Sequence, residues 1–560
     1  MAGIEDPITV IASPGKVLIV GGYLVLNKSY SGLVISVDAR VYSAVRTISH
    51  TQNTPTSQFS VKVNSFQFTD GFWEYIVKRS VEADGSLTTS VVQVENEHST
   101  KNKFIHTVLE TVFWIISHRN PEEINNLCDK SSTVSIVLGT DNDFYSQRSH
   151  FDSPSPSSQS IVKSDSQNNF ISIEQLQSLP RFNLTNSTIG NVHKTGLGSS
   201  AALVSSLTAS LLLHFGIVSK SSFATFTQLN PKAKVTSFEK LSTSSELAFK
   251  DNDRNIINSS DWHSKINNFD LKLIHNASQF SHCLAQGKIG SGFDVSCAIY
   301  GSHIYNRFSP SLIQSAMTLP NSRSVNFVVD PSNSKFDSKV QKVFLPHGLH
   351  LVLVDINSGS NTPSMVSKVL AWKTEFPDEG SQIWESISSK NDKVCTLFEK
   401  LDQLYTNNPE SYTAALDLCS THPAAEWGLL VGKCADLISI QVIYILIEVF
   451  NTSNEIRRLM KRMGDLSGVP IEPDQQTSLI DKCLLFPGVV MAGVPGAGGF
   501  DAIYCIVINE STRYDLVNSY IFKENSELTV TPLVCEEGDK DHDGCVLVDT
   551  DIDILYSHFS

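Results

Sequence analysis

Apolar residues along the first part of the chain follow two different periods. Val17–Val20 is a β-branched apolar run directly after a Pro-Gly turn, and Leu33–Ile48 alternates apolar and polar residues. Both patterns predict strands, and Ser132–Thr140 predicts another. Lys103–His118 instead repeats its apolar residues at helical spacing, which predicts an amphipathic helix.

The helical period dominates further along. Ala201–Phe215 predicts a helix that ends at Gly216, and Lys265–Gln286 predicts another. After a buried strand at Leu349–Ile356, the second half is mostly helical. Its predicted helices are Met365–Lys373, Gly380–Leu404, Gly428–Phe450 and Asn454–Ser467, and its strands are Val489–Ala492 and Asp501–Ile508.

Two polar segments interrupt the pattern. Residues 141–169 are dense in Ser, Asp, Asn and Pro, which predicts a mobile surface insertion at about 141–170. Residues 310–345 are again rich in Ser, Pro and Asn, and we place the main domain boundary there. The predicted domains are residues 1–310 and 345–560.

The composition is that of a globular protein. Of 560 residues, 41% are hydrophobic and 18% charged, so the chain can bury a sizeable core. Lys plus Arg total 43 against 58 Asp plus Glu, a net charge of −15. We therefore expect no nucleic-acid partner, and an anionic substrate would need a local positive pocket.

Cysteine usage and hydropathy indicate the compartment. The ten cysteines include no CxxC pair and several lie in apolar runs, which favours small buried side chains in a reducing compartment. The start, MAGIEDPITV, lacks the features of a signal peptide. Gly428–Phe450 is apolar, but four polar residues interrupt it, as is typical of a core helix. We expect a soluble cytoplasmic protein without a membrane segment.

The string GLGSSAA, Gly196–Ala202, begins one predicted helix. Glycines permit close backbone approach, and a helix start offers unpaired N–H groups, so the string predicts an anion site with Lys194 beside it. An ordinary capped helix explains it equally well. No GxxxxGK[ST] phosphate loop occurs. We reject a dinucleotide-binding fold, because its fingerprint needs an acidic residue about 20 positions further on and none lies between Ser199 and Phe238.

Three further segments carry candidate chemistry. GVPGAGGFDA, Gly493–Ala502, holds a glycine loop between two β-rich runs, and SPGKVL places Lys16 at the start of a strand. Asp294 lies between Phe293 and Val295, where a carboxylate is costly unless it is paired or functional. A capping or turn role for Asp294 remains the alternative.

Taken in order, SPGKVLIVGGYLVL, TGLGSSAA and GVPGAGGFDA resemble the three motifs of the GHMP kinase superfamily. Within it, the chain looks most like the fungal-type phosphomevalonate kinase branch. The strings that carry this resemblance are PGKVLIVGGYLVL, KTGLGSSAALV, AQGKIGSGFDV, GSNTPSMV, SGVPIEP and PGAGGFDAI. They extend from Ile11 to about Ile508.

The resemblance implies a two-domain α+β fold, N-terminal ribosomal protein S5 domain 2-like and C-terminal ferredoxin-like, with the active site between them. It implies phosphorylation of phosphomevalonate by ATP with Mg²⁺, in isoprenoid and sterol biosynthesis. The alternatives are another member such as mevalonate kinase, a diphosphomevalonate decarboxylase, or an idle ATP-binding regulator. The implied partners are small molecules, and the implied assembly is a monomer or homodimer.

The resemblance also assigns residues. It implies catalytic roles for Lys16 and Asp294 and a Mg²⁺ ligand in Ser200. The implied ATP-binding residues are Lys194, Thr195, Gly196, Leu197, Gly198, Ser199, Ser200 and Ala201. The implied substrate-binding residues are Lys16, Tyr23, Lys194, Ser291, Gly292, Ser360, Gly496, Ala497 and Gly498.

Two features depart from the superfamily pattern or leave it open. Mevalonate kinases carry a glutamate metal ligand on the helix before the catalytic aspartate, but Ile274–Gln286 contains no carboxylate, so a second metal ligand is not identified. Four basic residues on one predicted helix could bind substrate phosphate or form a solvated face; they are Arg457, Arg458, Lys461 and Arg462.

Overall fold

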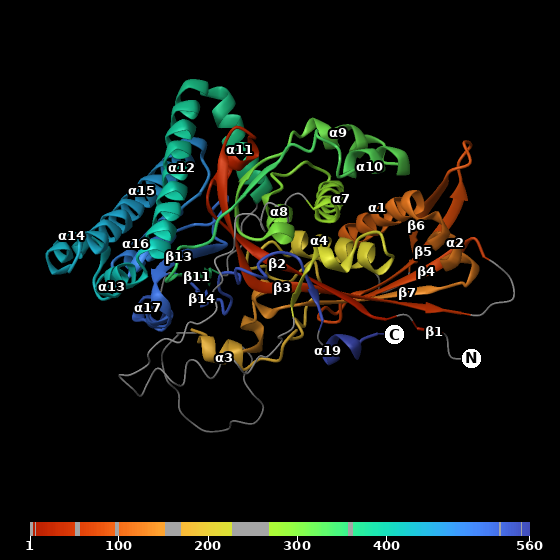
Figure 1. Cartoon of the computed structure of the whole chain (residues 1–560), viewed down its shortest axis with the longest axis horizontal. Helices are drawn as coiled ribbons and strands as arrows, with labels where there is room; N and C mark the ends of the chain where they lie inside the picture. The colour runs from red at the N-terminus through yellow and green to blue at the C-terminus, as the bar shows by residue number, and fades with distance from the viewer. Residues whose placement is uncertain are drawn as a thin grey trace.

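Two β-sheets, each flanked by helices, organise the chain (Figure 1). This computed structural model describes residues 4–5, 7–50, 56–95, 100–151, 170–226, 268–356, 362–525, 528–549 and 552–559. The larger sheet draws mainly on the first half of the chain and the smaller on the second. The α+β class predicted from the sequence is confirmed.

The larger sheet has the strand order β6-β5-β4-β7-β3-β2-β15-β8 in the described residues. These strands are β2 Thr9–Val20, β3 Ser31–Ser49, β4 Gln58–Asn64, β5 Phe72–Val81, β6 Leu87–Gln93, β7 Thr133–Thr140, β8 Ala224–Phe226 and β15 Val546–Val548. Two short strands pair with β3 and one with β9; they are β1 Ile4–Glu5, β9 His303–Asn306 and β10 Lys339–Lys342. The three strands predicted in this region are confirmed.

Helices cover one face of this sheet, and their apolar side chains pack with those of the strands in one hydrophobic core (Figure 1). They include α1 Lys103–Arg119, α2 Pro121–Asp129, α4 Ser199–His214, α7 Phe269–Gln286 and α8 Phe293–Tyr300. Helix α4 is buried along most of its length, which explains why its sequence is apolar or small on every side. The predictions for α1 and α4 are confirmed. Helix α7 begins after its N-cap, Asn268, and the predicted start at residue 265 lies outside the described residues.

The smaller sheet has the antiparallel order β12-β13-β11-β14. Its strands are β11 Leu349–Asp355, β12 Val489–Gly493, β13 Ala502–Ile508 and β14 Thr531–Pro532. Alternate residues of β11 face two different cores. One core holds helices α11 Thr362–Glu375, α12 Pro377–Asn407, α13 Pro409–Ser420 and α15 Leu437–Ser467; the other holds α16 Asp474–Leu484, α17 Asn509–Val517 and α18 Tyr520–Lys523.

The prediction of two helices at Gly428–Phe450 and Asn454–Ser467 is wrong. One long helix, α15, begins after Asp436, whose carboxylate accepts hydrogen bonds from the first-turn N–H groups, and continues through residue 450 without a break. The residues before this cap form only short turns, including α14 Trp427–Leu430. A strong cap fixed the start that hydropathy alone placed too early.

Helix α15 is also long and apolar enough to cross a membrane, by length and composition alone. Its residues Val442, Leu446 and Val449 are fully buried in the core that it shares with α12 and α13. Burial of this kind is what a core helix requires, as the sequence predicted.

The interpretation of residues 141–169 as a mobile surface insertion is wrong at its start. Short turns at Asn142–Phe144 and Arg148–His150 bury Phe144 and Tyr145, and Asp143 accepts hydrogen bonds from the backbone of Val534. A few aromatic side chains within a polar composition anchor this segment. Residues 152–169 lie outside the described residues, and α3 Ile173–Gln177 follows them.

The polar stretch at 310–345 carries two helices, α9 Ser311–Thr318 and α10 Ser322–Val329, whose apolar residues join the core beside α1. The chain also returns to the larger sheet at its end, because β15 pairs with β2 and α19 Asp553–Tyr556 packs beneath β7. The division into domains 1–310 and 345–560 stays a prediction.

All ten cysteines lie in the described residues, and nine of them are buried. Each is a free thiol. The prediction that they serve as small buried side chains is confirmed for nine of the ten.

The returning C-terminal segment is anchored by a buried ion pair. Asp543, 2% exposed, pairs with Lys342 and accepts a hydrogen bond from the Ser302 N–H at 2.8 Å. Arg40 on β3 donates to the Gly544 carbonyl at 2.8 Å. These contacts join the chain around Asp543 to β3, to β10 and to the loop that follows α8.

We expect Asp543→Ala to lower the free energy of unfolding by about 3–5 kcal/mol, because it removes the carboxylate opposite a largely buried ammonium group. Chemical denaturation followed by circular dichroism measures the change. The matched control is Glu448→Ala, which breaks the exposed pair with Lys393 and should cost less than about 1 kcal/mol. Equal losses in the two variants would contradict a structural role for Asp543.

Candidate active site

The GLGSS loop, Gly196–Ser200, begins helix α4 in the way that an anion site requires. Gly196 and Gly198 have φ values of +82° and +81°, and Gly198 is the N-cap of α4. A Cβ on Gly198 would lie 3.0 Å from Cε of Lys16. Glycine at this position therefore lets the loop turn and lets a lysine lie against its backbone. The Ala201 and Ala202 N–H groups donate to the Gly198 carbonyl at 3.1 Å, and the N–H groups before them in the first turn have no carbonyl within the helix to bond.

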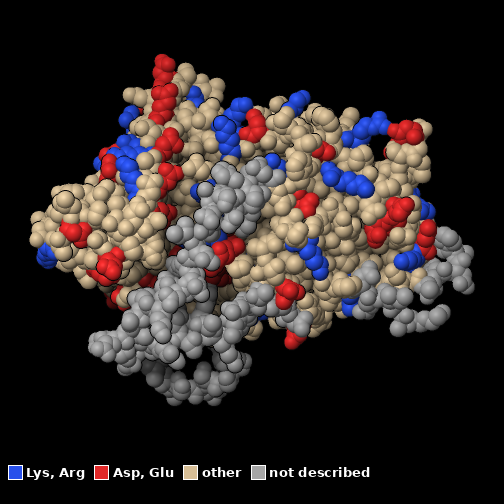
Figure 2. Space-filling model, viewed as in Figure 1, with Lys and Arg blue, Asp and Glu red and all other residues tan. Residues whose placement is uncertain are grey.

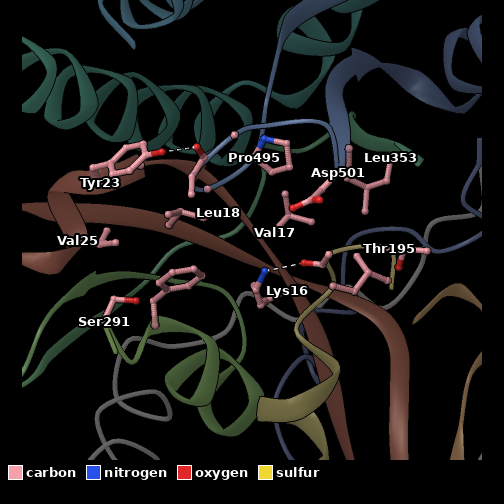
Figure 3. Close-up of a pocket in the computed structure, with 18 of the residues that line it drawn as sticks. Lys16, Val17, Leu18, Tyr23, Val25, Thr195, Ser291, Leu353, Pro495 and Asp501 are labelled. Carbon is pink, nitrogen blue, oxygen red and sulfur yellow. Dashed lines mark hydrogen bonds between the residues drawn. The ribbon is translucent and has the colours of Figure 1, made fainter. Parts of the chain in front are cut away.

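Lys16 on β2 is joined to this loop twice. Its backbone N–H donates to the Leu197 carbonyl at 2.9 Å, and its Nζ donates to the Gly196 carbonyl at 2.8 Å (Figure 3). Burial lowers the pKa of Lys16, and the carboxylates of Asp294 and Asp501 oppose that shift. The ammonium group lies in the cavity wall beside the Gly196 carbonyl, where an anion that enters the cavity can meet it.

A second glycine loop, Pro495–Gly499, lies against the same strand. Its Gly496 N–H donates to the Leu18 carbonyl at 3.2 Å, and the Tyr23 hydroxyl donates to the Ala497 carbonyl at 2.9 Å. A Cβ on Gly498 would lie 2.0 Å from the Ile471 carbonyl oxygen, so this turn admits only glycine. We call this segment the PGAGG loop.

The SPGKVL segment, the GLGSS loop and the PGAGG loop all contribute residues to the lining of one cavity of about 220 Å³, as Figure 3 shows. Leu18 of the larger sheet and Leu353 of the smaller sheet both line it, so the cavity lies where the two sheets meet. The predicted site residues around it are Lys16, Tyr23, Thr195, Gly196, Leu197, Ser291, Gly496, Ala497 and Gly498. Segments up to some 480 residues apart in the chain thus converge on one site.

Asp294 lies in the first turn of α8, with Gly292 as the N-cap at φ +86°. Its Oδ1 accepts a hydrogen bond from the Val295 N–H at 3.0 Å, and its side chain is 23% exposed. Its charge acts on Lys16, while Phe293 beside it lines the cavity. Gly292 and not Asp294 is therefore the N-cap of α8, and no side-chain cap hydrogen bond forms there; the catalytic role of Asp294 stays a prediction.

Ser200, in the first turn of α4, contacts a histidine that the sequence analysis did not consider. Its Oγ lies 3.1 Å from Nε2 of His282 on α7, and Oδ2 of Asp294 lies 4.0 Å from the same nitrogen. Burial lowers the pKa of His282, although Asp294 opposes that shift.

Seven of the predicted residues are not part of the cavity lining: Lys194, Gly198, Ser199, Ser200, Ala201, Gly292 and Asp294. Lys194 pairs in a β-bridge with Tyr145 beside the GLGSS loop, and burial lowers its pKa. Ser360 lies outside the described residues. Ser199 and Ala201 lie in the first turn of α4.

The structure adds residues that sequence reasoning missed. Asp501 lines the cavity directly after the PGAGG loop, and the quoted string GGFDA was the available signal. Nε2 of His193 lies 3.2 Å from Oδ1 of Asp355, which is 1% exposed at the end of β11. This hydrogen bond raises the pKa of His193 and ties the residue before Lys194 to the smaller sheet. No sequence spacing indicated that pair.

Three of the four basic residues singled out on α15 form ion pairs with carboxylates. Arg457 pairs with Glu472 at 2.7 Å, Lys461 with Asp474 at 2.7 Å and Arg462 with Glu379 at 3.0 Å; Arg458 donates to a backbone carbonyl on its own helix. These contacts favour a structural and surface role over binding of substrate phosphate. Figure 2 shows basic and acidic side chains interspersed over one face of the molecule. Positive charge for an anion therefore has to be local.

Comparison with known proteins gives a consistent result. No model of a protein family matches the chain. The chain is 32% identical to the peroxisomal phosphomevalonate kinase of Arabidopsis thaliana over 518 residues, covering 90% of each protein. It is 29% identical to the phosphomevalonate kinase of Candida albicans, covering 89% of each. A crystal structure of a Lin0012 protein from Listeria innocua shares the fold, with a TM-score of 0.51, 12% identity, and coverage of 97% of this chain and 100% of that one.

The α+β fold and the three glycine-rich motifs around one cavity are those of a GHMP-type kinase. Identity of 32% over nine tenths of both chains narrows this class. The chain belongs to the phosphomevalonate kinase family.

Proposed function

We propose that this protein transfers the γ-phosphoryl group of ATP to (R)-5-phosphomevalonate, forming ADP and 5-diphosphomevalonate in isoprenoid and sterol biosynthesis. An oxygen of the acceptor phosphate forms a bond to the γ-phosphorus, and the bond from that phosphorus to the β–γ bridging oxygen breaks. The observation that carries the proposal is the identity of 28–32% to four phosphomevalonate kinases over about nine tenths of the chain. The convergence of the motifs on one cavity supports it.

The start of α4 fits the triphosphate of ATP. Left-handed glycines leave space that a Cβ would fill, and the first-turn N–H groups and helix dipole favour anions. The residues proposed to bind ATP are Lys194, Thr195, Gly196, Leu197, Gly198, Ser199, Ser200 and Ala201. Ser200 offers a hydroxyl oxygen, a ligand type that Mg²⁺ accepts, and a bound Mg²⁺ would neutralise phosphate charge.

Lys16 is proposed to stabilise the oxygens between the two reacting phosphates. Its ammonium group is already held at Gly196, so little reorganisation is needed when charge develops on the transferred group. Asp294 can accept a proton from the acceptor phosphate. That phosphate is already acidic, with a second pKa of about 6, so Asp294 acts mainly by orienting Lys16.

The acceptor is proposed to lie on the other side of the cavity. Ser291, Gly292, Tyr23 and the PGAGG loop residues Gly496, Ala497 and Gly498 would bind it, together with Lys16 and Lys194. Two lysines supply the local positive charge that a protein of net charge −15 needs for two phosphorylated substrates. The proposed contribution of Ser360 awaits a test by mutation.

Three further inferences concern the two domains, the assembly with its partners, and the cellular location. We infer an S5-like domain around the larger sheet and a ferredoxin-like domain around the smaller antiparallel sheet. We infer a monomer or homodimer that binds small molecules and no nucleic acid. We keep the cytoplasm as the proposed location, while noting that the Arabidopsis relative is named peroxisomal.

The decisive assay measures ADP release from Mg-ATP with mevalonate, phosphomevalonate, diphosphomevalonate, homoserine and galactose as acceptors. We expect turnover with phosphomevalonate alone. Preference for mevalonate or a sugar would reassign the chain within the superfamily. Release of CO₂ with diphosphomevalonate would indicate a decarboxylase, and nucleotide binding without turnover on any acceptor would indicate an idle regulator.

Lys16→Ala and Asp294→Asn should each lower kcat by about 10²–10⁴-fold, because each removes charge that is organised at the reacting phosphates. Calorimetry should show a nucleotide Kd within several-fold of the wild-type value. Lys393→Ala is the control, since Lys393 pairs with Glu448 on the exposed surface of the helices. Unchanged turnover in either site variant would refute its role.

Gly198→Ala tests whether the glycine at the start of α4 is needed for nucleotide binding. Both this change and the control Gly216→Ala place alanine at a left-handed position, at either end of α4, but only the first adds a Cβ against Lys16. We expect Gly198→Ala to weaken binding of a fluorescent ATP analogue about tenfold or more. Gly216→Ala should leave the Kd within about twofold, and equal weakening in both variants would show that helix destabilisation alone is responsible.

A further inference from the structure

His282 lies where α7 meets α4 and α8, the helices that carry Ser200 and Asp294. It comes from α7, and its ring reaches Ser200 on α4 and Asp294 on α8. The residue is 3% exposed, and Phe104 on α1 packs against the ring at 5.7 Å between centroids. A ring enclosed in this way has one available orientation, so it can fix the groups that it touches.

Two polar groups meet Nε2 of His282. The side-chain amide nitrogen of Gln286 and Oγ of Ser200 each lie 3.1 Å from it. A neutral ring nitrogen either donates one proton or accepts at one lone pair, so the tautomer of His282 sets the direction of both contacts. With the ring proton on Nδ1, Nε2 accepts, which suits the amide nitrogen of Gln286, and the Ser200 hydroxyl is the donor in its contact.

This direction has a consequence for Ser200. A serine hydroxyl has one proton and two acceptor lone pairs. With its proton committed to His282, the oxygen keeps both lone pairs for other partners, and no hydrogen is directed at an approaching cation. If His282 donated instead, one lone pair would be used and the serine proton would be free to turn toward the cation.

The same direction separates His282 from Asp294. Oδ2 of Asp294 is 4.0 Å from Nε2, beyond hydrogen-bond distance, and an accepting Nε2 has no proton to offer a carboxylate. Asp294 thus keeps its charge for Lys16, on which it acts electrostatically.

We propose that His282, with its ring proton on Nδ1, is a positioning residue, which holds the Ser200 hydroxyl with its proton turned away from the nucleotide-bound cation and so prepares the oxygen as a ligand. The proposal rests on the proposed function, because it needs Ser200 to meet the cation of Mg-ATP. It assigns His282 no contact with either substrate.

The experiment compares the affinity of the full-length protein for AMPPNP with and without Mg²⁺ by titration calorimetry. His282→Phe keeps an aromatic ring beside Phe104 but removes the acceptor nitrogen. We expect it to reduce the gain in affinity that Mg²⁺ gives about tenfold, with the metal-free Kd within about twofold of wild type. His282→Gln, which can present a carbonyl oxygen to Ser200, should restore most of that gain.

A double-mutant cycle tests whether His282 acts through Ser200. In wild-type background we expect His282→Phe to lower kcat about 10–100-fold and to leave KM for phosphomevalonate within about threefold. In a Ser200→Ala background the same change should cost less than about threefold. Additive losses in the two backgrounds would overturn the proposal, since they would show a structural effect.

His275→Phe is the matched control. His275 lies two turns earlier on α7, is 2% exposed, and contacts Asn276 instead of Ser200. It should lower thermal stability without changing the effect of Mg²⁺ on AMPPNP binding. If His282→Phe is not folded by circular dichroism, His282→Asn takes its place, because its shorter amide cannot reach Ser200.

The outcomes separate this inference from the proposed function. A wild-type protein that turns over phosphomevalonate, with His282→Phe keeping its full gain from Mg²⁺, overturns only the role of His282. A wild-type protein inert toward phosphomevalonate overturns the proposed function. The AMPPNP comparison still measures the effect of His282 on the cation in that case.

Discussion

The double attachment of Lys16 to the GLGSS loop is the contact on which the site depends. One strand residue donates through both its backbone and its ammonium group to consecutive carbonyls of the loop, at 2.9 and 2.8 Å. Because the loop leads directly into α4, this attachment fixes the helix start relative to the larger sheet. The close contact is possible only because Gly198 has no Cβ. Loop geometry, helix dipole and lysine charge are thereby set together.

Electrostatics at this site are local and balanced by neighbours. The protein carries a net charge of −15, yet the cavity contains a buried lysine flanked by Asp294 and Asp501. Burial weakens the charged form of the lysine, and the two carboxylates favour it. The ammonium group is thereby held at the cavity wall by the Gly196 carbonyl. Phosphate oxygens that enter the cavity can compete with that carbonyl for its hydrogen bond.

Contacts from the second half of the chain complete the arrangement. The PGAGG loop bonds to β2, and Asp355 at the end of β11 holds His193 just before the GLGSS loop. The C-terminal segment then returns to the larger sheet through β15 and the Asp543 ion pair. The two sheets are therefore joined on several sides of the cavity. A change in their relative position would alter the space between the PGAGG loop and α8, where the acceptor is proposed to bind.

Periodicity in the sequence was sufficient for β2, β3 and β7 of the larger sheet and for helices α1 and α4, since period-two and period-3.6 patterns report directly which face is buried. It predicted no strand at β4, β5 or β6, which form one edge of that sheet. The glycine motifs also predicted the loop at the start of α4, because a left-handed backbone at a helix start favours glycine. Local pattern failed for α15, where Asp436 decides the start, and for Phe144, whose burial depends on distant partners. Only tertiary structure could bring His282, Asp355 and Asp501 to the site. Their roles arise from interactions across about 80 to 485 residues, and no local spacing records such interactions.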